Sequence, residues 1–339
     1  MVKNIDQFID KLLSGFNPKV RKVIAGRFGL RNGKKATLQE IGDELGITRE
    51  RVRQIEEQAL KKLNPLIKGE AAPTLEFAAK YLAGVGDVRR DDYFLLEVKH
   101  SLFPKSNVKY LDQKLRFIFL TGGKPLYYKE DDLMRPFWYS NDGAKKKFFE
   151  FAKHMTNFFK TSDKKEILDD KIHLKECGDF HKVHFLSIPK DFGINVFGDV
   201  GLRVWPEIAP NTVRDKAYLV LRKYGAPLHF EDIATYVSRY GLDKKPAHVQ
   251  TVHNELIKDN RFVLVGRGMY ALREQGFEPG TVREVIARIL KTKGPLVSEE
   301  VVNMVNKQRI LKENTILLSL QNRRFFKRLD DGRYHVKEA

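Results

Sequence analysis

The run TRERVRQIE, residues 48–56, places side chains that can hydrogen-bond nucleic-acid bases at the start of an expected helix. Arginine suits guanine, glutamine suits adenine, and glutamate can accept a hydrogen bond from cytosine. At 3.6 residues per turn, these polar side chains gather opposite Val52, Ile55 and Ala59, which must be buried. The alternative is an ordinary solvated helix, held by pairs between Arg53 and the glutamates that follow it. The residues expected to contact DNA are Thr48, Arg49, Glu50, Arg51, Arg53, Gln54 and Lys61.

Two helices joined by a short turn must position this face. Thr37 stands three residues before Glu40 and directly ahead of an apolar-periodic run, which is the capping-box pattern of a helix that begins near Leu38. Gly46 can take the left-handed conformation that ends this helix, and Thr48 can cap the next one. Two helices separated by three or four residues have the geometry of a helix-turn-helix.

The flanking sequence predicts where this module ends. Ile5, Phe8, Ile9, Leu12 and Leu13 have helical spacing, so a short amphipathic helix is expected before it. Asn64-Pro65 is expected to stop the second helix, because a proline disfavours the helical conformation of the residue before it. The segment 68–73, with Gly69 and Pro73, is expected to be a linker.

Residues 17–63 resemble region 4 of the sigma-70 family of RNA polymerase initiation factors. The resemblance is carried by FNPKVRKVIAGRFGL and above all by TRERVRQIE. It implies that the second helix reads a promoter element. Few residues precede the match, so the family's other promoter-reading regions, and therefore a complete sigma factor, are not expected. The implied roles are base contact for Arg49, Glu50 and Gln54, and contact with phosphate or flanking bases for Arg51 and Arg53.

Composition favours a polyanionic partner. The 339 residues carry a formal net charge of +18, which favours nucleic acid over a membrane surface. Lys and Arg outnumber Asp and Glu in each of the ranges 1–68, 211–275 and 281–339, so several modules are basic. The single cysteine, Cys177, excludes an intramolecular disulfide and is typical of a reducing compartment. No apolar run is long enough to cross a bilayer, so a cytoplasmic protein is expected.

The C-terminal third contains an internal repeat. YGAPLHFEDIATYV is echoed by KGPLVSEEVVNMV, and DNRFVLVGRGMYAL is echoed by RRFFKRLDDGRYHV. Each copy indicates three helices and a hairpin, which turns at Gly266-Arg267-Gly268 in the first copy and at Asp330-Asp331-Gly332 in the second. Three helices with a two-stranded wing form a winged helix-turn-helix.

The first copy, residues 212–275, resembles the HARE-HTH family, a winged helix found in the delta subunit of bacterial RNA polymerase, in chromatin regulators and in fusions to restriction enzymes. PLHFEDIA and TVHNELIKDNRFVLVGRGMYAL carry this resemblance. It implies nucleic-acid or polymerase-associated work, and docking to protein stays an alternative. The second copy, 281–339, is a more distant relative by the same pattern. Candidate DNA contacts in the first copy are Gln250, His253, Lys258, Arg261 and Arg267.

The aromatic-rich region 74–207 is less specific. Helical periodicity appears at 74–83, 91–103, 109–120 and 144–160, and LYYKEDDLMRPFWYS indicates two short strands around an acidic turn. Helices followed by a hairpin suggest another winged-helix-like unit.

This region also contains residue types found at metal and catalytic sites. His173, Cys177, His181 and His184 lie close together, but their spacing matches no common zinc module, so no metal is expected. Acidic pairs could hold Mg²⁺ for a nuclease, although adjacent acids at turns are more often solvated surface. Those pairs are Asp91-Asp92, Asp131-Asp132 and Asp169-Asp170. With no phosphate loop or serine elbow, an enzyme is not expected.

The sequence therefore predicts a mainly α, multi-domain protein of helix-turn-helix and winged-helix modules with small β-hairpin wings. The expected domains are 1–68, 74–207, 211–275 and 281–339. The expected function is that of a sequence-specific transcription regulator that binds double-stranded DNA and associates with RNA polymerase, without a cofactor, a membrane partner or a small-molecule substrate. Two alternatives stay open: a delta-like polymerase factor that reads little sequence, and an accessory protein of a restriction or repair system.

Overall fold

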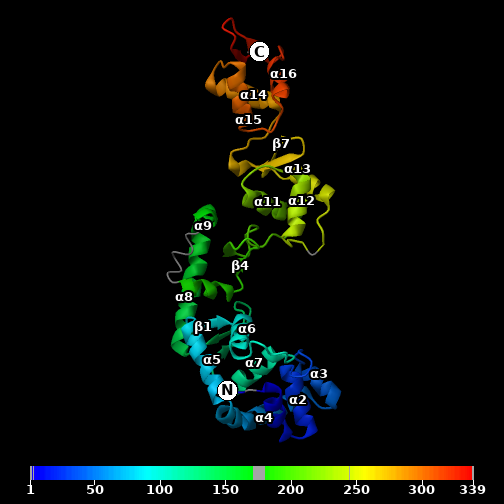
Figure 1. Ribbon diagram of the computed structural model, residues 1–339, viewed down its shortest axis with the longest axis vertical. Helices are drawn as coiled ribbons and strands as arrows, with labels where there is room; N and C mark the ends of the chain where they lie inside the picture. The colour runs from blue at the N-terminus through cyan, green and yellow to red at the C-terminus, as the bar shows by residue number, and fades with distance from the viewer. Residues whose placement is uncertain (1, 3, 171–179, 244, 338–339) are drawn as a thin grey trace. The chain divides into compact units, whose positions relative to one another are not determined.

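The computed structural model describes residue 2 and the ranges 4–170, 180–243 and 245–337. The chain divides into two compact units, Met1–Gly193 and Ile194–Ala339 (Figure 1). Helices predominate in both, and the strands form small antiparallel sheets. The expected fold class, mainly α with helix-turn-helix and winged-helix modules, is confirmed. Among the described helices, none has both the length and the apolar composition that a bilayer span requires.

The first unit begins with the helix-turn-helix (Figure 1). The Thr37 hydroxyl accepts a hydrogen bond from the backbone N–H of Glu40 at 3.1 Å, and the Glu40 carboxylate accepts one from the N–H of Thr37 at 2.6 Å. The expected capping box is therefore present, and the expected helix before the module is also found. The helices are α1 (Ile5–Ser14), α2 (Pro18–Phe28), α3 (Leu38–Leu45) and α4 (Arg49–Glu70).

Helix α4 is longer than the sequence predicts. Pro65 lies inside it, so the stop expected at Asn64-Pro65 is wrong. The proline removes one helical hydrogen bond, but Leu63 and Ile67 on the same helix are fully buried in the core. The side-chain amide of Asn64 also donates to the carbonyl of Thr121 at 2.6 Å. Tertiary contacts therefore outweigh the local signal.

The expected linker at 68–73 is also wrong. Gly69 lies within α4, and Ala71 is fully buried between α4 and α5 (Ala72–Gly84). Pro73 occupies the second position of α5, where its missing N–H costs no helical hydrogen bond. The Gly and Pro signals thus mark a junction between two packed helices.

The next elements have the winged-helix order. The strand β1 follows the first helix, two helices come next, and a hairpin of β2 and β3 closes the unit. The sheet order is β1-β3-β2, with both pairs antiparallel. Helix periodicity and the hairpin were predicted, whereas β1 is too short to produce a period-two pattern. The elements after α5 are β1 (Val88–Arg90), α6 (Asp91–Leu102), α7 (Leu111–Gly122), β2 (Leu126–Tyr128) and β3 (Phe137–Tyr139).

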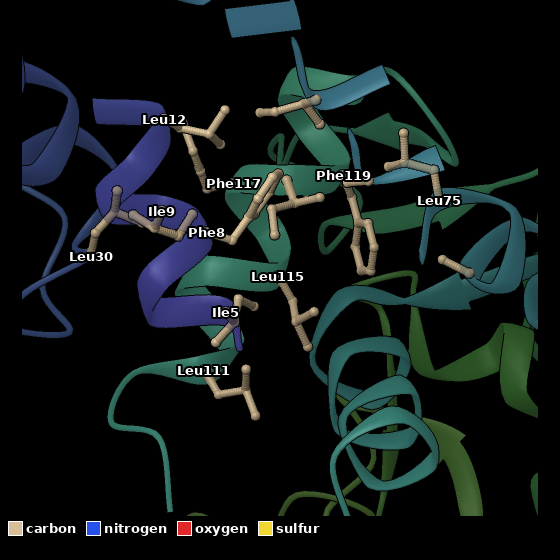
Figure 2. Packing of buried hydrophobic residues seen from close by; sticks show 14 of the residues in the cluster. Ile5, Phe8, Ile9, Leu12, Leu30, Leu75, Leu111, Leu115, Phe117 and Phe119 are labelled. Atoms are coloured by element: carbon tan, nitrogen blue, oxygen red, sulfur yellow. The ribbon is translucent and has the colours of Figure 1, made fainter. Parts of the chain in front are cut away.

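One hydrophobic core joins the helix-turn-helix to this winged-helix unit. Figure 2 shows α1 beside α7, with Phe8 and Phe117 in one continuous cluster that also includes Leu75 of α5. The ranges 1–68 and 74–207, expected as separate domains, thus share this core, and the compact unit that contains it extends to Gly193. The expected range 74–207 also crosses the border at Gly193 between the two units.

The rest of this region adds helices and a small sheet. Phe148 and Phe159 of α8 are buried, so both rings belong to the core of this unit. His173 and Cys177 lie outside the described residues. Within the described ranges, no three His, Cys, Asp or Glu side chains are grouped so that they could hold a metal ion. The elements are α8 (Asp142–Thr161), α9 (Lys164–Asp170), η1 (Phe180–Ser187), β4 (Phe192–Ile194) and β5 (Val200–Leu202).

The second unit contains a winged helix with the same order of elements. Its sheet order is β6-β8-β7, so the strand after the first helix again pairs with the last strand of the hairpin. Gly268 at the hairpin turn has a φ of 70°, as the turn signal predicts. The elements are α11 (Val213–Tyr224), β6 (Leu228–His229), α12 (Phe230–Arg239), α13 (Val249–Lys258), β7 (Phe262–Gly266), β8 (Met269–Leu272) and η2 (Arg273–Gln275).

The last segment repeats this order with shorter strands. Leu296 forms an isolated antiparallel bridge with Tyr334, in the place that β6 has in the preceding module. Gly332 at the hairpin turn has a φ of 85°. The buried apolar residues of the three helices and the hairpin form a core of their own. The elements are α14 (Val282–Lys293), α15 (Ser298–Asn306), α16 (Glu313–Leu320), β9 (Phe326–Arg328) and β10 (Tyr334–Val336).

Candidate nucleic-acid interface

A small separate core fixes the orientation of α4 in the helix-turn-helix. Val23 of α2, Ile41 of α3, and Val52 and Ile55 of α4 form it, and each is at most 8% exposed. Burial of these four side chains turns the opposite face of α4 outward, as its periodicity predicts. The residues of that face are therefore presented by a packed scaffold.

The turn between α3 and α4 depends on two glycines. Gly46 has a φ of 62° and a ψ of 37°, the left-handed conformation that a side chain disfavours. At Gly42 an added Cβ would lie only 2.7 Å from the carbonyl oxygen of Ile47, so a glycine lets α3 approach the turn. Thr48 then caps α4 by accepting a hydrogen bond from the N–H of Arg51 at 3.2 Å.

The exposed face of α4 carries a network of ion pairs and hydrogen bonds. Arg53 donates to Glu50 at 2.8 Å and to Glu57 at 3.3 Å, and Arg51 donates to the side-chain oxygen of Gln54 at 3.1 Å. The hydrogen bond from Arg53 holds the pKa of the Glu50 carboxyl below its usual value. Exposed pairs of this kind are screened by solvent and contribute little to stability, so DNA can replace them at little cost.

The sequence-predicted residues of α4 are thus brought together on one exposed face. Arg49, Glu50, Arg51, Arg53, Gln54 and Lys61 are all exposed. Lys61 pairs with Glu57 at 2.9 Å, farther along the helix than the other five. The predicted pair between Arg53 and Glu57 is present, whereas Glu56 has a different partner.

That partner is Arg27, which sequence reasoning missed. Its guanidinium donates to Glu56 at 2.9 Å and to the carbonyl of Ala36 at 2.7 Å. It therefore ties α2 and the loop before α3 to the middle of α4. The Glu56 side chain is only 16% exposed, so this bond is better shielded than those on the outer face. No sequence pattern indicates a pair 29 residues apart.

In the second unit, the residues predicted to bind DNA separate into two groups. Gln250 is exposed on α13 and donates to Asn254 at 3.0 Å, Lys258 is exposed 3.5 Å from Glu255, and Arg267 is exposed at the hairpin turn. These side chains can reach a ligand. His253 instead stacks on Phe230 with a centroid distance of 4.3 Å, which is a packing contact between α13 and α12.

Arg261 belongs to the scaffold, so its prediction as a phosphate contact is not supported by its geometry. Its guanidinium pairs with Asp259 at 2.7 Å and Asp215 at 3.1 Å, and lies 5.0 Å from the ring centroid of Tyr218. Burial alone would raise the pKa of the Asp259 carboxyl, but hydrogen bonds from Arg261 outweigh it and the pKa lies below 3.8. Two carboxylates already satisfy this cation.

Arg261→Gln is therefore expected to lower the free energy of unfolding of the winged helix by about 2 kcal/mol at neutral pH. Because the folded-state pKa values of Asp215 and Asp259 are lowered, their contribution is present above pH 3.8 and is lost as the pH falls through the lowered values. The variant should lose less stability than the wild type over that acid range. Urea denaturation at several pH values measures this, with Arg267→Gln as the exposed control. If Arg261→Gln and Arg267→Gln lower the free energy of unfolding equally, the scaffold role of Arg261 is contradicted.

Comparison with known families matches two of these modules. Residues 12–64 match the model "Sigma-70, region 4". Residues 211–275 match the HARE-HTH model, a helix-turn-helix domain whose description names ASXL and restriction endonucleases. No solved structure matches the chain.

Three of the curated relatives that the chain matches are sigma factors, each over a short stretch. The chain is 49% identical over 57 residues to RNA polymerase sigma factor sigB of Arabidopsis thaliana, covering 17% of this chain and 10% of that protein. It is 51% identical over 53 residues to RNA polymerase sigma factor SigA of Clostridium acetobutylicum, covering 16% and 14%. It is 42% identical over 60 residues to RNA polymerase principal sigma factor HrdD of Streptomyces coelicolor, covering 18% of each. The chain thus spans less than a fifth of the length of each of these three relatives. It joins a sigma-70 region 4 helix-turn-helix, within residues 12–64, to a HARE-HTH module at residues 211–275.

Proposed function

We propose that this protein is a sequence-specific regulator of transcription that reads a duplex DNA site with the N-terminal turns of α4. The observation that carries this proposal is the exposed face of α4, where Arg49, Glu50 and Gln54 project from a helix whose opposite side is buried. In helix-turn-helix proteins the N-terminal residues of the second helix contact base edges in the major groove. Arginine, glutamate and glutamine supply the donors and acceptors that such reading requires.

The charge of the chain supports binding to DNA. A net charge of +18 gives a long-range attraction to phosphate that speeds encounter and adds affinity without sequence preference. Base contacts on α4 would then supply the selectivity. We infer that the protein acts by binding, without a cofactor or a small-molecule substrate.

We further propose that the protein works together with RNA polymerase. The relatives matched by the first module are named as RNA polymerase sigma factors, which supports a shared partner for the module that the chains have in common. Region 4 is the part in common, so this proposal concerns docking and promoter-proximal binding, and does not extend to promoter melting.

A specific observation favours protein docking by the HARE-HTH module. The exposed face of α13 includes Val249, which is 38% exposed, and Ile257, which is 63% exposed, beside the neutral side chains of Gln250 and Asn254. A helix that reads DNA lies between phosphates, and such a face offers them little charge. This favours a division of labour in which α4 reads DNA and the HARE-HTH module contacts protein.

A genome-wide occupancy map tests the proposed function. We expect discrete sites that share a sequence motif and persist when an inhibitor clears polymerase from promoters, because α4 supplies the selectivity. Sites that follow polymerase and disappear with it, without a shared motif, would contradict sequence reading and assign the protein to the delta-like class.

A further inference from the structure

In the segment 281–337 the third helix itself carries no positive charge. Helix α16 has the sequence ENTILLSL, without Lys or Arg. Its exposed side chains include Glu313, Asn314 and Leu318, the last of which is 71% exposed. A third helix that enters the major groove passes between two rows of phosphates, where cations are favourable and a carboxylate is not. Helix α16 is therefore poorly suited to lie against DNA.

Four cations of this segment line a groove between α14 and the hairpin of β9 and β10. Arg283 and Lys291 line it from α14, and Arg324 and Lys337 line it from the two ends of the hairpin. Phe325 lies among them and is 36% exposed. We name this surface, formed by Arg283, Lys291, Arg324, Phe325 and Lys337, the basic groove.

The aromatic ring positions two of these cations. The guanidinium carbon of Arg283 lies 4.9 Å from the centroid of the Phe325 ring, and that of Arg324 lies 5.7 Å from it. Such cation–π contacts hold a guanidinium in place without neutralising its charge. The groove therefore keeps two oriented positive charges at its centre.

Three other arginines of the segment already have partners. Arg288 is paired with Glu278, Arg333 is paired with Asp331, and the buried Arg309 donates to backbone carbonyls. The four groove cations differ from them, since none forms an ion pair with a carboxylate of the described ranges. Unpaired, exposed cations on one surface are the electrostatic footprint of a polyanion site.

The carboxylate that lines the groove is held by another interaction. Glu284 accepts a hydrogen bond from the backbone N–H of Thr281 at 2.6 Å, as part of the capping box of α14. This bond fixes the carboxylate at the helix start. The groove therefore keeps an excess of positive charge.

We propose that the basic groove binds the phosphodiester backbone of a nucleic acid, so that the first helix and the hairpin of this segment make the contact in place of its third helix. Lys and Arg donate to phosphate oxygens and fix the position of a module without reading sequence. Duplex and single-stranded nucleic acid share this chemistry, and Phe325 could additionally stack on an unpaired base. The proposal does not require base reading by α4.

The experiment uses the full chain and two variants with the same change in charge. The groove variant is Lys291→Gln, Arg324→Gln, Lys337→Gln. The control variant is Lys293→Gln, Lys307→Gln, Lys312→Gln, which changes three lysines that are exposed elsewhere on the same segment. Both are titrated over a salt series with a duplex of unrelated sequence and with a single-stranded oligonucleotide of equal length.

We expect the groove variant to bind about a hundredfold more weakly at 0.1 M salt, with a salt slope shallower by about two to three, because each duplex phosphate contact contributes about 0.9. The control variant should keep the wild-type slope within about one unit. A loss confined to the single strand would support the groove and identify that form as its ligand, and a loss with the duplex would identify the duplex. Phe325→Leu should weaken only single-strand binding when a base stacks there.

A separate control for folding is needed, because Arg324→Gln removes a contact with the Phe325 ring. The double variant Lys291→Gln, Lys337→Gln leaves that contact intact and should still reduce the duplex slope by about two. Equal losses in the groove and control variants would show diffuse attraction and overturn the proposal. A groove variant whose salt slope is unchanged with both nucleic acids would also overturn the proposal. So would tighter binding to polyglutamate than to DNA, if the groove variant loses that binding.

Discussion

The double variant Glu50→Ala, Gln54→Ala is expected to recover a different motif from randomised duplexes than the wild type does. Both side chains are exposed on the outer face of α4, where they can hydrogen-bond base edges but add no net attraction to phosphate. Each substitution should relax preference at one or two positions, at about 1–3 kcal/mol of discrimination.

Contacts in the free protein sharpen this prediction. Glu50 accepts hydrogen bonds from Arg53, and Gln54 accepts one from Arg51. Removing both acceptors releases the guanidinium of Arg51, leaves Arg53 paired only with Glu57, and deletes one negative charge. Affinity for unrelated duplex should therefore stay the same or rise while selectivity falls, a combination that general damage to the module would not produce.

A matched control exists on the neighbouring helix. Gln39 and Asp43 of α3 are exposed, and the Gln39 amide donates to the Asp43 carboxylate at 2.7 Å. Gln39→Ala, Asp43→Ala removes the same chemical groups and the same charge, but from α3. Sequence selection with the wild type and both double variants, at one salt concentration, is the test. Recovery of the wild-type motif with the α4 variant would contradict the hypothesis that α4 reads bases. A concurrent loss of co-purification with RNA polymerase would indicate that α4 docks on the polymerase instead.

Sequence predicted the helix-turn-helix well where its determinants are local. Thr37 and Glu40 are three residues apart, and Gly46 needs only its own positive φ, so the bounds of α3 follow from the chain itself. The buried side of α4 followed from periodicity for the same reason. The length of α4 could not be predicted from the local sequence, because the burial of Leu63 and Ile67 against distant helices outweighs the stop signal of Pro65.

The roles of individual charged residues were harder to predict. Arg27 and Arg261 are as basic as Arg49, yet each is held by carboxylates that lie far along the chain or in an adjoining turn. A helical wheel separates buried from exposed faces, but it cannot show which exposed cation is already paired. The strand β1 escaped notice because its three residues are shorter than any recognisable alternation.

Phe117→Ala, in α7, is expected to impair the helix-turn-helix although it lies outside residues 12–64. Phe117 is fully buried, and its ring meets that of Phe28 in α2 edge to face at 4.9 Å. Truncating such a side chain costs about 3–5 kcal/mol, a large part of the stability of an ordinary domain. Because one core joins α1 and α4 to α7, the loss should reach the DNA-binding face.

Denaturation of the fragment 1–193 by guanidinium measures this effect. The fragment contains Trp138 and lacks Trp205, so its tryptophan fluorescence reports the winged-helix core, while binding to a labelled duplex reports the helix-turn-helix. We expect the two signals to change together in the wild type and to shift together to lower denaturant in Phe117→Ala. Leu96→Ala, at a leucine of α6 that is 48% exposed, should change stability by less than about 0.5 kcal/mol.

The same argument predicts the behaviour of the isolated first module. A fragment of residues 1–70 would expose Leu63, Ile67 and the apolar face of α1, all of which are buried by α5 and α7 in the complete unit. It should therefore unfold at lower denaturant than the fragment 1–193 and bind duplex DNA more weakly. If 1–70 is as stable as the longer fragment, or if Phe117→Ala leaves DNA affinity unchanged while fluorescence shifts, the helix-turn-helix is an independent domain. The shared core predicts the opposite, because α4 is long enough to belong to both modules.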